Sequence, residues 1–328
     1  MRNVARRSVL AGLGSLAAGA AIALPAKPAP LANRVKLTLG ANSVPHVVPF
    51  QFIADELKPL GVDVELVKFA RYADTRTALA SGSIAMGSIG PADVPIALSS
   101  GLKTITALMG VGVSPKNPIV KKGQPLAKWS DLTGLKIGIA PGSAVWFQFA
   151  ATLIEAGIDY SKLTTLNMQG AGTVMIQAMQ RGDIDLFIGW EPFESMAMQQ
   201  LGAQRIETLD YSKSAAVGPE LGVVGANKAY LTANREAVKR FVWAYLTIQD
   251  RLNASKSALA EGIAAYTGLD TTISANVAAT MTLGQFLTLD QVKRQAKSFF
   301  QFGVLTKDVT ADLDGYFESA LVAEVAKG

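Results

Sequence analysis

Residues 131–143 (DLTGLKIGIAPGS) have the residue types and spacing of a loop that can hold an anion or a polar ligand head. Three alternating apolar residues predict a buried strand over 135–140, and Pro141 and Gly142 end it. Ser143 can cap a helix that begins at Ala144 and runs to about residue 157. Such a loop presents free backbone N–H groups and the positive end of a helix dipole, so Gly142, Ser143 and Ala144 are candidate ligand contacts. The alternative is an ordinary strand-to-helix loop that binds nothing, because it has the same pattern.

Nine further residues occupy equivalent positions after expected strands. Arg71 can form a charge-assisted bond to an anion, Trp190 offers an aromatic wall, and Glu191 suits an amine on the ligand. Arg71 also fits a solvated loop cation, and His46 a hydrogen bond at a helix start. The full set is Asn42, Ser43 and His46 after the first strand, Arg71 and Tyr72 after the second, Gly90 and Pro91 after the third, and Trp190 and Glu191 in the second half of the chain.

The composition excludes several kinds of chemistry. The 328-residue chain has no cysteine, so it has no disulfide, no thiolate nucleophile and no Cys-rich zinc site. His46 is the single histidine, which excludes metal sites built on several histidines. We therefore expect no metal, no cofactor and no enzymatic activity.

The N-terminal 32 residues have the order of an export signal. Arg2, Arg6 and Arg7 precede an apolar run of small residues over 9–24, and Ala and Pro follow it to residue 32. Arg6-Arg7 resembles a twin-arginine signal, with the general secretory route as the alternative. Residues 1–32 carry four of the 31 basic residues and no acidic one, so the remainder holds 27 basic against 26 acidic residues. This balance gives no indication of nucleic-acid binding.

From residue 34 onward, expected strands and helices alternate, which predicts βαβ units and mostly parallel sheets. Loop-like sequence at 112–129 and at 212–221 divides this pattern into two lobes, and residues 222–227 form a strand that returns to the first lobe. We expect lobe 1 to comprise residues 33–114 plus 218–328, and lobe 2 residues 115–217. Helices are expected over 47–60, 235–252, 271–281, 290–300 and 313–325.

An internal repeat supports two similar lobes. Residues 78–86 (ALASGSIAM) are matched a hundred positions later by 178–186 (AMQRGDIDL). In each copy a helix is expected to end at a glycine, Gly82 or Gly182, before a short strand and a glycine-containing loop. Since ligands of parallel sheets bind outside the carboxyl ends of the strands, two facing lobes would offer these loops to a shared cleft.

These segments resemble substrate-binding proteins of ABC importers, most closely the group that handles nitrate, sulfonates such as taurine, and thiamine precursors. The resemblance rests on residues 78–91, 131–143 and 182–193 (GDIDLFIGWEPF in the last), and it covers most of the chain after the signal. Ala85 departs from the aspartate of many members, and the first loop, 42–50, is short and carries Pro45-His46. Both departures bear on which class of ligand is bound more than on the fold.

The resemblance implies a type II periplasmic-binding-protein fold: two lobes, each a mostly parallel sheet flanked by helices, with the ligand cleft between them. It implies a monomer in the periplasm that captures a small organic anion, a sulfonate or related compound, and delivers it to an ABC importer permease. Nitrate, or a neutral nitrogenous ring such as a thiamine-precursor pyrimidine, is the alternative ligand, and an enzyme on the same fold is a further one.

Overall fold

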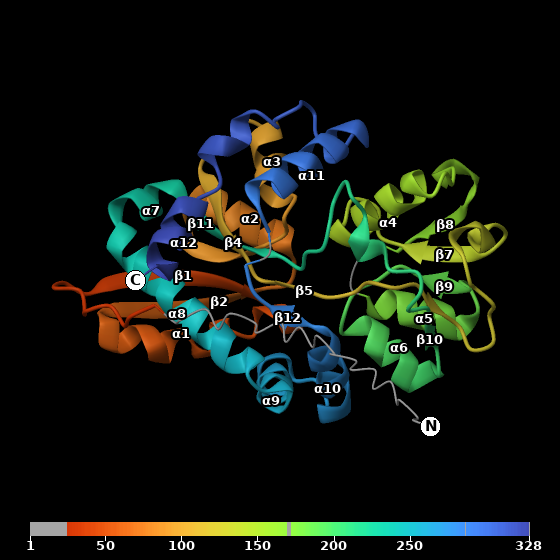
Figure 1. Cartoon of the computed structure of the whole chain (residues 1–328), viewed down its shortest axis with the longest axis horizontal. Helices are drawn as coiled ribbons and strands as arrows, with labels where there is room; N and C mark the ends of the chain where they lie inside the picture. Colours follow the sequence, from red (N-terminus) through yellow and green to blue (C-terminus); the bar gives the residue numbers. More distant parts are fainter. Residues whose placement is uncertain (1–24, 169–171, 286, 328) are drawn as a thin grey trace, which may run out of the picture.

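The computed structural model describes residues 25–168, 172–285 and 287–327. The first 24 residues of the expected export signal lie outside this part of the chain. Two sheets of five strands each, flanked by helices, stand side by side (Figure 1). No helix of the described residues is long and apolar enough to cross a membrane.

The first sheet has the strand order β2-β1-β3-β11-β4. Its strands are β1 (Val35–Asn42), β2 (Val62–Phe69), β3 (Met86–Ile89), β4 (Ile105–Gly110) and β11 (Val223–Asn227). β11 pairs antiparallel with both β3 and β4, while β1 pairs parallel with β2 and β3. Four of the five strands therefore run the same way, and the returning strand expected at 222–227 is the reversed one.

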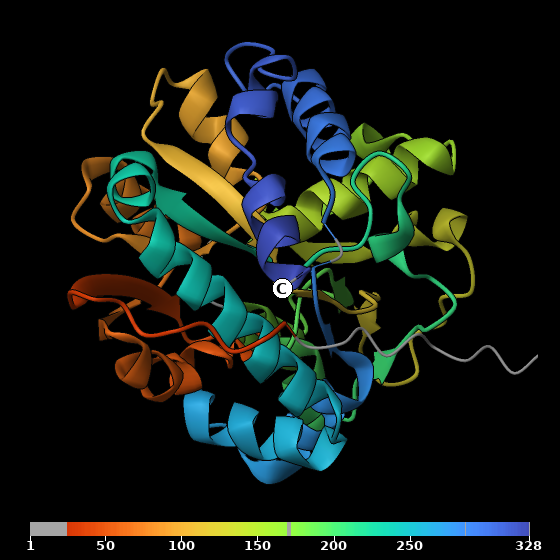
Figure 2. The same ribbon diagram turned by 60° about the vertical axis from the view of Figure 1, so that its left-hand side comes forward.

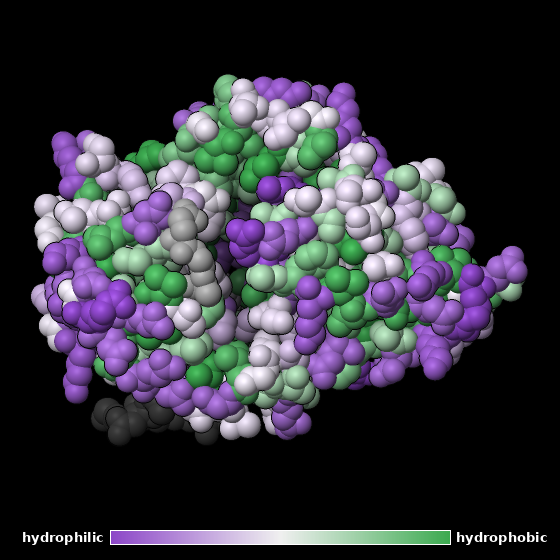
Figure 3. Space-filling view, turned by 180° about the vertical axis from the view of Figure 1, so that it is seen from behind, coloured by the Kyte–Doolittle hydropathy of each residue, from purple (hydrophilic) through white to green (hydrophobic). Residues whose placement is uncertain are grey.

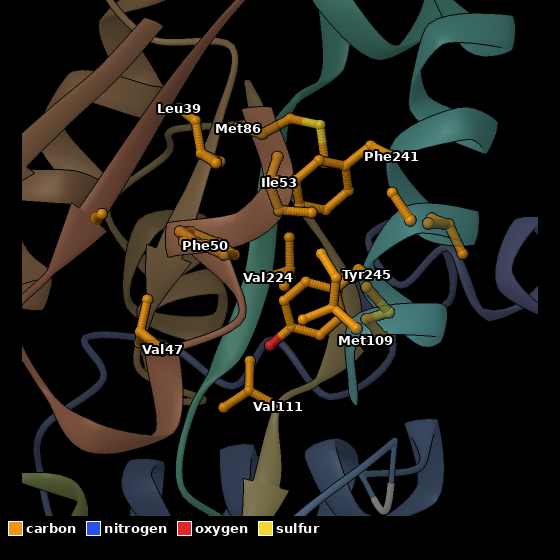
Figure 4. Close-up of a cluster of buried hydrophobic side chains, with 14 of the residues drawn as sticks. Leu39, Val47, Phe50, Ile53, Met86, Met109, Val111, Val224, Phe241 and Tyr245 are labelled. Carbon is orange, nitrogen blue, oxygen red and sulfur yellow. The ribbon is translucent and has the colours of Figure 1, made fainter. Parts of the chain in front are cut away.

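Six helices of the described residues pack around this sheet. Flanking it are α1 (Phe50–Leu57), α2 (Tyr72–Ser81), α3 (Asp93–Ser99), α7 (Lys228–Ala233), α8 (Arg235–Asn253) and α12 (Ser319–Ala326). Figure 4 shows the core between the sheet and α8, where Phe50 meets the Phe241 ring edge-on at 6.0 Å and the Tyr245 ring at 5.8 Å. All three side chains are buried, so they fix α1 and α8 against the sheet.

The second sheet has the order β10-β6-β9-β7-β8. Its strands are β6 (Ile119–Val120), β7 (Lys136–Ile139), β8 (Thr164–Asn167), β9 (Leu186–Phe187) and β10 (Gln204–Arg205), with α4 (Ala144–Glu155), α5 (Thr173–Arg181) and α6 (Phe193–Leu201) around them. β6 runs antiparallel to both neighbours, and the other strands are parallel. The expected architecture of two mostly parallel sheets is confirmed.

The internal repeat has the predicted backbone form. α2 ends at Gly82 with φ 78°, and α5 ends at Gly182 with φ 80°. Both glycines are therefore left-handed helix caps, a conformation that costs other residues energy.

Segments near the C-terminus contact both halves of the molecule. The pair β5 (Gly112–Val113) and β12 (Thr282–Leu283) forms a small separate sheet. α10 (Thr271–Thr280) packs against α6, and α11 (Leu289–Gln301) packs against α4 (Figure 2). At the second of these contacts the ring centres of Phe147 and Phe299 lie 4.0 Å apart. Figure 3, the view from behind, shows a narrow furrow between the two halves, with hydrophilic residues beside it.

Several expected helices were wrong in extent. Residues 47–60 are not one helix: the 3-10 turns η1 (Pro45–Val47) and η2 (Lys58–Leu60) flank α1, because prolines break the backbone hydrogen bonding. The predicted helix over 313–325 begins only at Ser319, since Tyr316 and Glu318 bond instead to Ala107 on β4. The helix α9 (Lys256–Thr267) lies in the part of the chain that is expected to be helical from residue 229 onward, although no separate range is predicted for it.

Candidate ligand-binding site

A hydrogen-bonded pair, His46 and Tyr72, lies where β1 and β2 end. His46 is only 7% exposed, and its Nε2 bonds to the Tyr72 hydroxyl. Burial, with a smaller effect of the Lys116 charge, lowers the pKa of His46 to about 3, so the imidazole is neutral at pH 7. Burial also raises the pKa of Tyr72 well above its usual value. The pair is therefore an uncharged donor and acceptor group.

Two glycines flank this pair. A Cβ atom added at Gly90 would lie 3.4 Å from the Tyr72 ring, and one added at Gly222 would lie 2.9 Å from the Tyr72 hydroxyl and 3.5 Å from His46 Nε2. Gly90 also donates its N–H to Asp93 at 2.6 Å, and the neighbouring Pro91 is buried. The end of β3 and the start of β11 thus meet the ends of β1 and β2 at one place.

The other first-lobe candidates have different surroundings. Asn42 is 2% exposed, and its side-chain oxygen accepts bonds from Ser88 at 2.8 Å and Thr75 at 3.2 Å. It therefore ties the strand ends together. Ser43 is exposed, and Arg71 is 73% exposed and ion-paired with Asp74 at 2.8 Å.

The predicted cap of α4 is confirmed. Ser143 Oγ accepts the N–H of Trp146 at 3.2 Å and donates to the Ala140 carbonyl at 2.8 Å. Gly142 has φ 82° and is exposed, and Ala144 begins the helix. Because the cap uses the hydroxyl and the Trp146 N–H, the N–H groups of the first two helical residues are the remaining donors of this loop.

Trp190 and Glu191 follow β9 but face different partners. The Trp190 ring is partly buried and stands perpendicular to Phe193 at 5.6 Å. The Glu191 carboxylate accepts bonds from Ser195 N and Oγ at 3.0 and 2.9 Å and forms an ion pair with Arg205. Arg205 also pairs with Glu194 at 3.2 Å, so one guanidinium offsets part of the charge of two carboxylates in the second half of the molecule. Among the described residues, no hydrogen bond or ion pair joins the candidates of the first half to those of the second.

Sequence reasoning missed a buried lysine between the two groups of candidates. Lys116 lies on the segment that leads from the first sheet to the second and is 3% exposed. Its ammonium donates to Gln148 Oε1 at 2.5 Å and to the Glu220 carbonyl at 2.8 Å. Burial lowers the pKa of Lys116 to about 8, an effect that the carboxylates of Glu220, Glu194 and Asp210 partly oppose.

The surroundings of Lys116 are polar and shared by distant segments. Gln148 on α4 also donates to the Gly218 carbonyl at 2.8 Å, and Gln295 on α11 bonds to the Glu220 carboxylate. Burial raises the pKa of Glu220 to about 7. Pro115, Asn117 and Pro118 around the lysine indicate an exposed loop, so no local pattern could have revealed its burial.

Neither of two surface hollows lies at these residues. One, of about 640 Å³, lies between α9 and α10, and the other, of about 350 Å³, lies beside β4 and α12. Within the described residues, no group of three His, Cys, Asp or Glu side chains is placed to hold a metal ion.

Two α/β halves of this topology, with strand ends directed at the crossing segments, define the type II periplasmic-binding-protein fold. The structure of the periplasmic aliphatic sulphonate binding protein from Escherichia coli superposes with a TM-score of 0.74 at 19% identity, over 88% of this chain and 99% of that one. The chain belongs to the NMT1/THI5-like family, whose sequence model matches residues 57–248.

Two proteins of Escherichia coli K12 are related in sequence. The taurine-binding periplasmic protein is 28% identical over 184 residues, 56% of each chain. The putative aliphatic sulfonates-binding protein is 27% identical over 209 residues, 62% of each chain. The match thus spans about three fifths of the length of these relatives.

Proposed function

We propose that this protein is the solute-binding protein of an ABC importer and that it captures a small organic anion, a sulfonate or related compound, between its two lobes. The lobes would be residues 33–114 plus 218–328 and residues 115–217, and the exported protein would deliver its solute to a permease from the periplasm. Membership of the NMT1/THI5-like family and the two sulfonate- or taurine-binding relatives support this proposal.

The buried ammonium of Lys116 is the observation that favours an anion. Its two hydrogen bonds leave one of three N–H donors for a ligand, and it lies close enough to His46 to lower the pKa of that ring. The first turn of α4 would add backbone N–H groups. Arg205 is ion-paired with both Glu191 and Glu194, so it offsets only part of the repulsion that these carboxylates would exert on an anion.

Capture would shift the equilibrium between open and closed lobes. A solute that contacts His46 and Tyr72 on one side and the Ser143 loop or Trp190 on the other gains those contacts together only when the lobes are closed. The remaining candidates, Asn42 and Arg71 among them, would then shape the cleft or reach the solute on closure.

The alternatives differ in the charge of the ligand. Nitrate would need the same cationic group in a smaller space, whereas a neutral pyrimidine would stack on Trp190 and gain little from Lys116. Catalysis is a weaker proposal, because the chain has no cysteine and its one histidine is neutral and bonded to Tyr72.

Calorimetric titration of the purified protein with taurine, longer alkanesulfonates, nitrate and a thiamine-precursor pyrimidine tests the proposal. We expect a sulfonate to bind and the Lys116→Gln variant to bind it at least about tenfold more weakly. Lys213→Gln, which removes a 79% exposed lysine, is the matched control and should bind normally. Binding of the pyrimidine alone, unaffected by Lys116→Gln, would refute an anionic ligand.

A further inference from the structure

The segment before β1 is held against α8 by its backbone. The Pro25 carbonyl accepts the indole N–H of Trp243 at 2.9 Å, and the Ala29 carbonyl accepts two bonds from Arg240, at 2.8 and 3.0 Å. The Leu31 N–H donates to the Leu60 carbonyl at 3.0 Å. Figure 2 shows this red segment crossing α8 on its way to β1.

The face of α8 under this segment, together with Gly61, fits it closely. Arg240 and Trp243 lie three residues apart on α8, hence on one face, and are only 9% and 6% exposed. Lys27 places its ammonium 5.9 Å from the Trp243 ring centre. A Cβ atom at Gly61 would lie 3.1 Å from Leu31 Cβ and 3.2 Å from Leu31 N, so the segment is seated closely on the fold.

We propose that residues 25–33 are a permanent arm of the first lobe and that the peptidase which removes the export leader cuts on the N-terminal side of Pro25. This inference rests on the proposed export, through the twin-arginine route, in which the chain folds before the leader is removed. A processing peptidase needs an accessible, extended chain, and four hydrogen bonds withhold residues 25–31 from it once the protein has folded. The leader would then be shorter than the 32 residues that the sequence pattern alone predicts.

Intact-mass analysis of the protein recovered from the periplasm of a Gram-negative host that expresses the full chain tests the position of the cut. We expect the processed protein to begin at Pro25 or at a residue before it. A first residue between 26 and 33, or an unprocessed chain in the periplasm, would overturn the proposal.

Thermal unfolding of two purified forms, one beginning at residue 25 and the other at 33, tests the arm without any need for export. We expect the longer form to melt more than about 3 °C higher. Trp243→Phe removes the N–H donor together with part of a buried ring, so it should lower the melting temperature of both forms, and of the longer form by more.

Arg251→Gln is the matched control on α8, because the exposed Arg251 pairs with Glu56 on α1 and not with the arm. It should change both forms equally. Equal effects of Trp243→Phe in both forms would show that the arm does not bind α8. Solute titration of the longer form is a separate readout, so a stable arm on a protein that binds no solute would contradict only the proposed function.

Discussion

The single histidine permits a sharp test of the electrostatics at the candidate site. His46 is buried, and its pKa falls from 6.5 to about 3 in the folded protein. In the unfolded chain the ring takes up a proton below pH 6.5, whereas in the folded protein it does so only near pH 3. The folded pKa is the lower one, so the free energy of unfolding decreases as the pH falls through this window.

The size of the effect follows from the two pKa values. From its unfolded pKa of 6.5 down to pH 5, the ring is protonated in the unfolded chain but not in the folded protein, an interval of about 1.5 pH units. This difference lowers the free energy of unfolding by about 2 kcal/mol between pH 7 and pH 5. Glu220 acts in the opposite direction, because its pKa is raised to about 7 and the folded protein keeps that proton to higher pH. A comparison with a variant that lacks only the histidine removes this second contribution.

His46→Gln is the suitable variant, because a neutral amide can still bond to the Tyr72 hydroxyl. Urea unfolding of both proteins at pH 7 and pH 5 should show a stability loss that is about 2 kcal/mol greater for the wild type than for the variant. In protein labelled only at histidine, the one ring signal should not titrate above about pH 4. A midpoint between pH 6 and 7, or the same pH dependence in both proteins, would refute the reasoning.

Three further substitutions probe other parts of the structure. Ser143→Ala removes the cap of α4 and should cost about 1 kcal/mol in urea unfolding, with Ser143→Asp restoring most of it; an unchanged stability would contradict the capping role. Phe299→Ala deletes a fully buried ring against Phe147 and should cost about 3–5 kcal/mol, while a loss below about 1 kcal/mol would show that the α4–α11 contact contributes little. Arg71→Ala should leave the melting temperature unchanged, because solvent screens its exposed ion pair. If Arg71 leaves Asp74 to reach an anionic solute, calorimetry should show that the same variant binds this solute about tenfold more weakly. An unchanged affinity would show that Arg71 is not part of the binding site.

Local patterns in the sequence were sufficient for the order of strands and helices. Alternating apolar residues predict β7, the cap at Ser143 predicts the start of α4, and Gly82 and Gly182 predict the ends of α2 and α5. Each of these features depends on residues that are close along the chain, so a single sequence contains the necessary information.

The chemistry of the candidate site depends on contacts between distant residues, which the sequence does not reveal. Lys116 is buried because Gln148 and Glu220, 32 and 104 residues away, supply its acceptors. Glu191 looks free in the sequence, but Arg205 on β10 forms an ion pair with it and with Glu194. Loop composition predicts solvent exposure on average, and it cannot identify the one loop that the fold encloses.

The position of Gln148 has a mechanical consequence. Its side chain joins Lys116 on the outgoing connection between the sheets to Gly218 on the returning one, and it lies five residues after Ser143 on the same helix. The 12-residue helix α4 is rigid over this distance, so a small rotation at its first turn is carried directly to both connections. The loop that would contact a solute and the two connections about which the lobes would rotate are therefore joined by one helix.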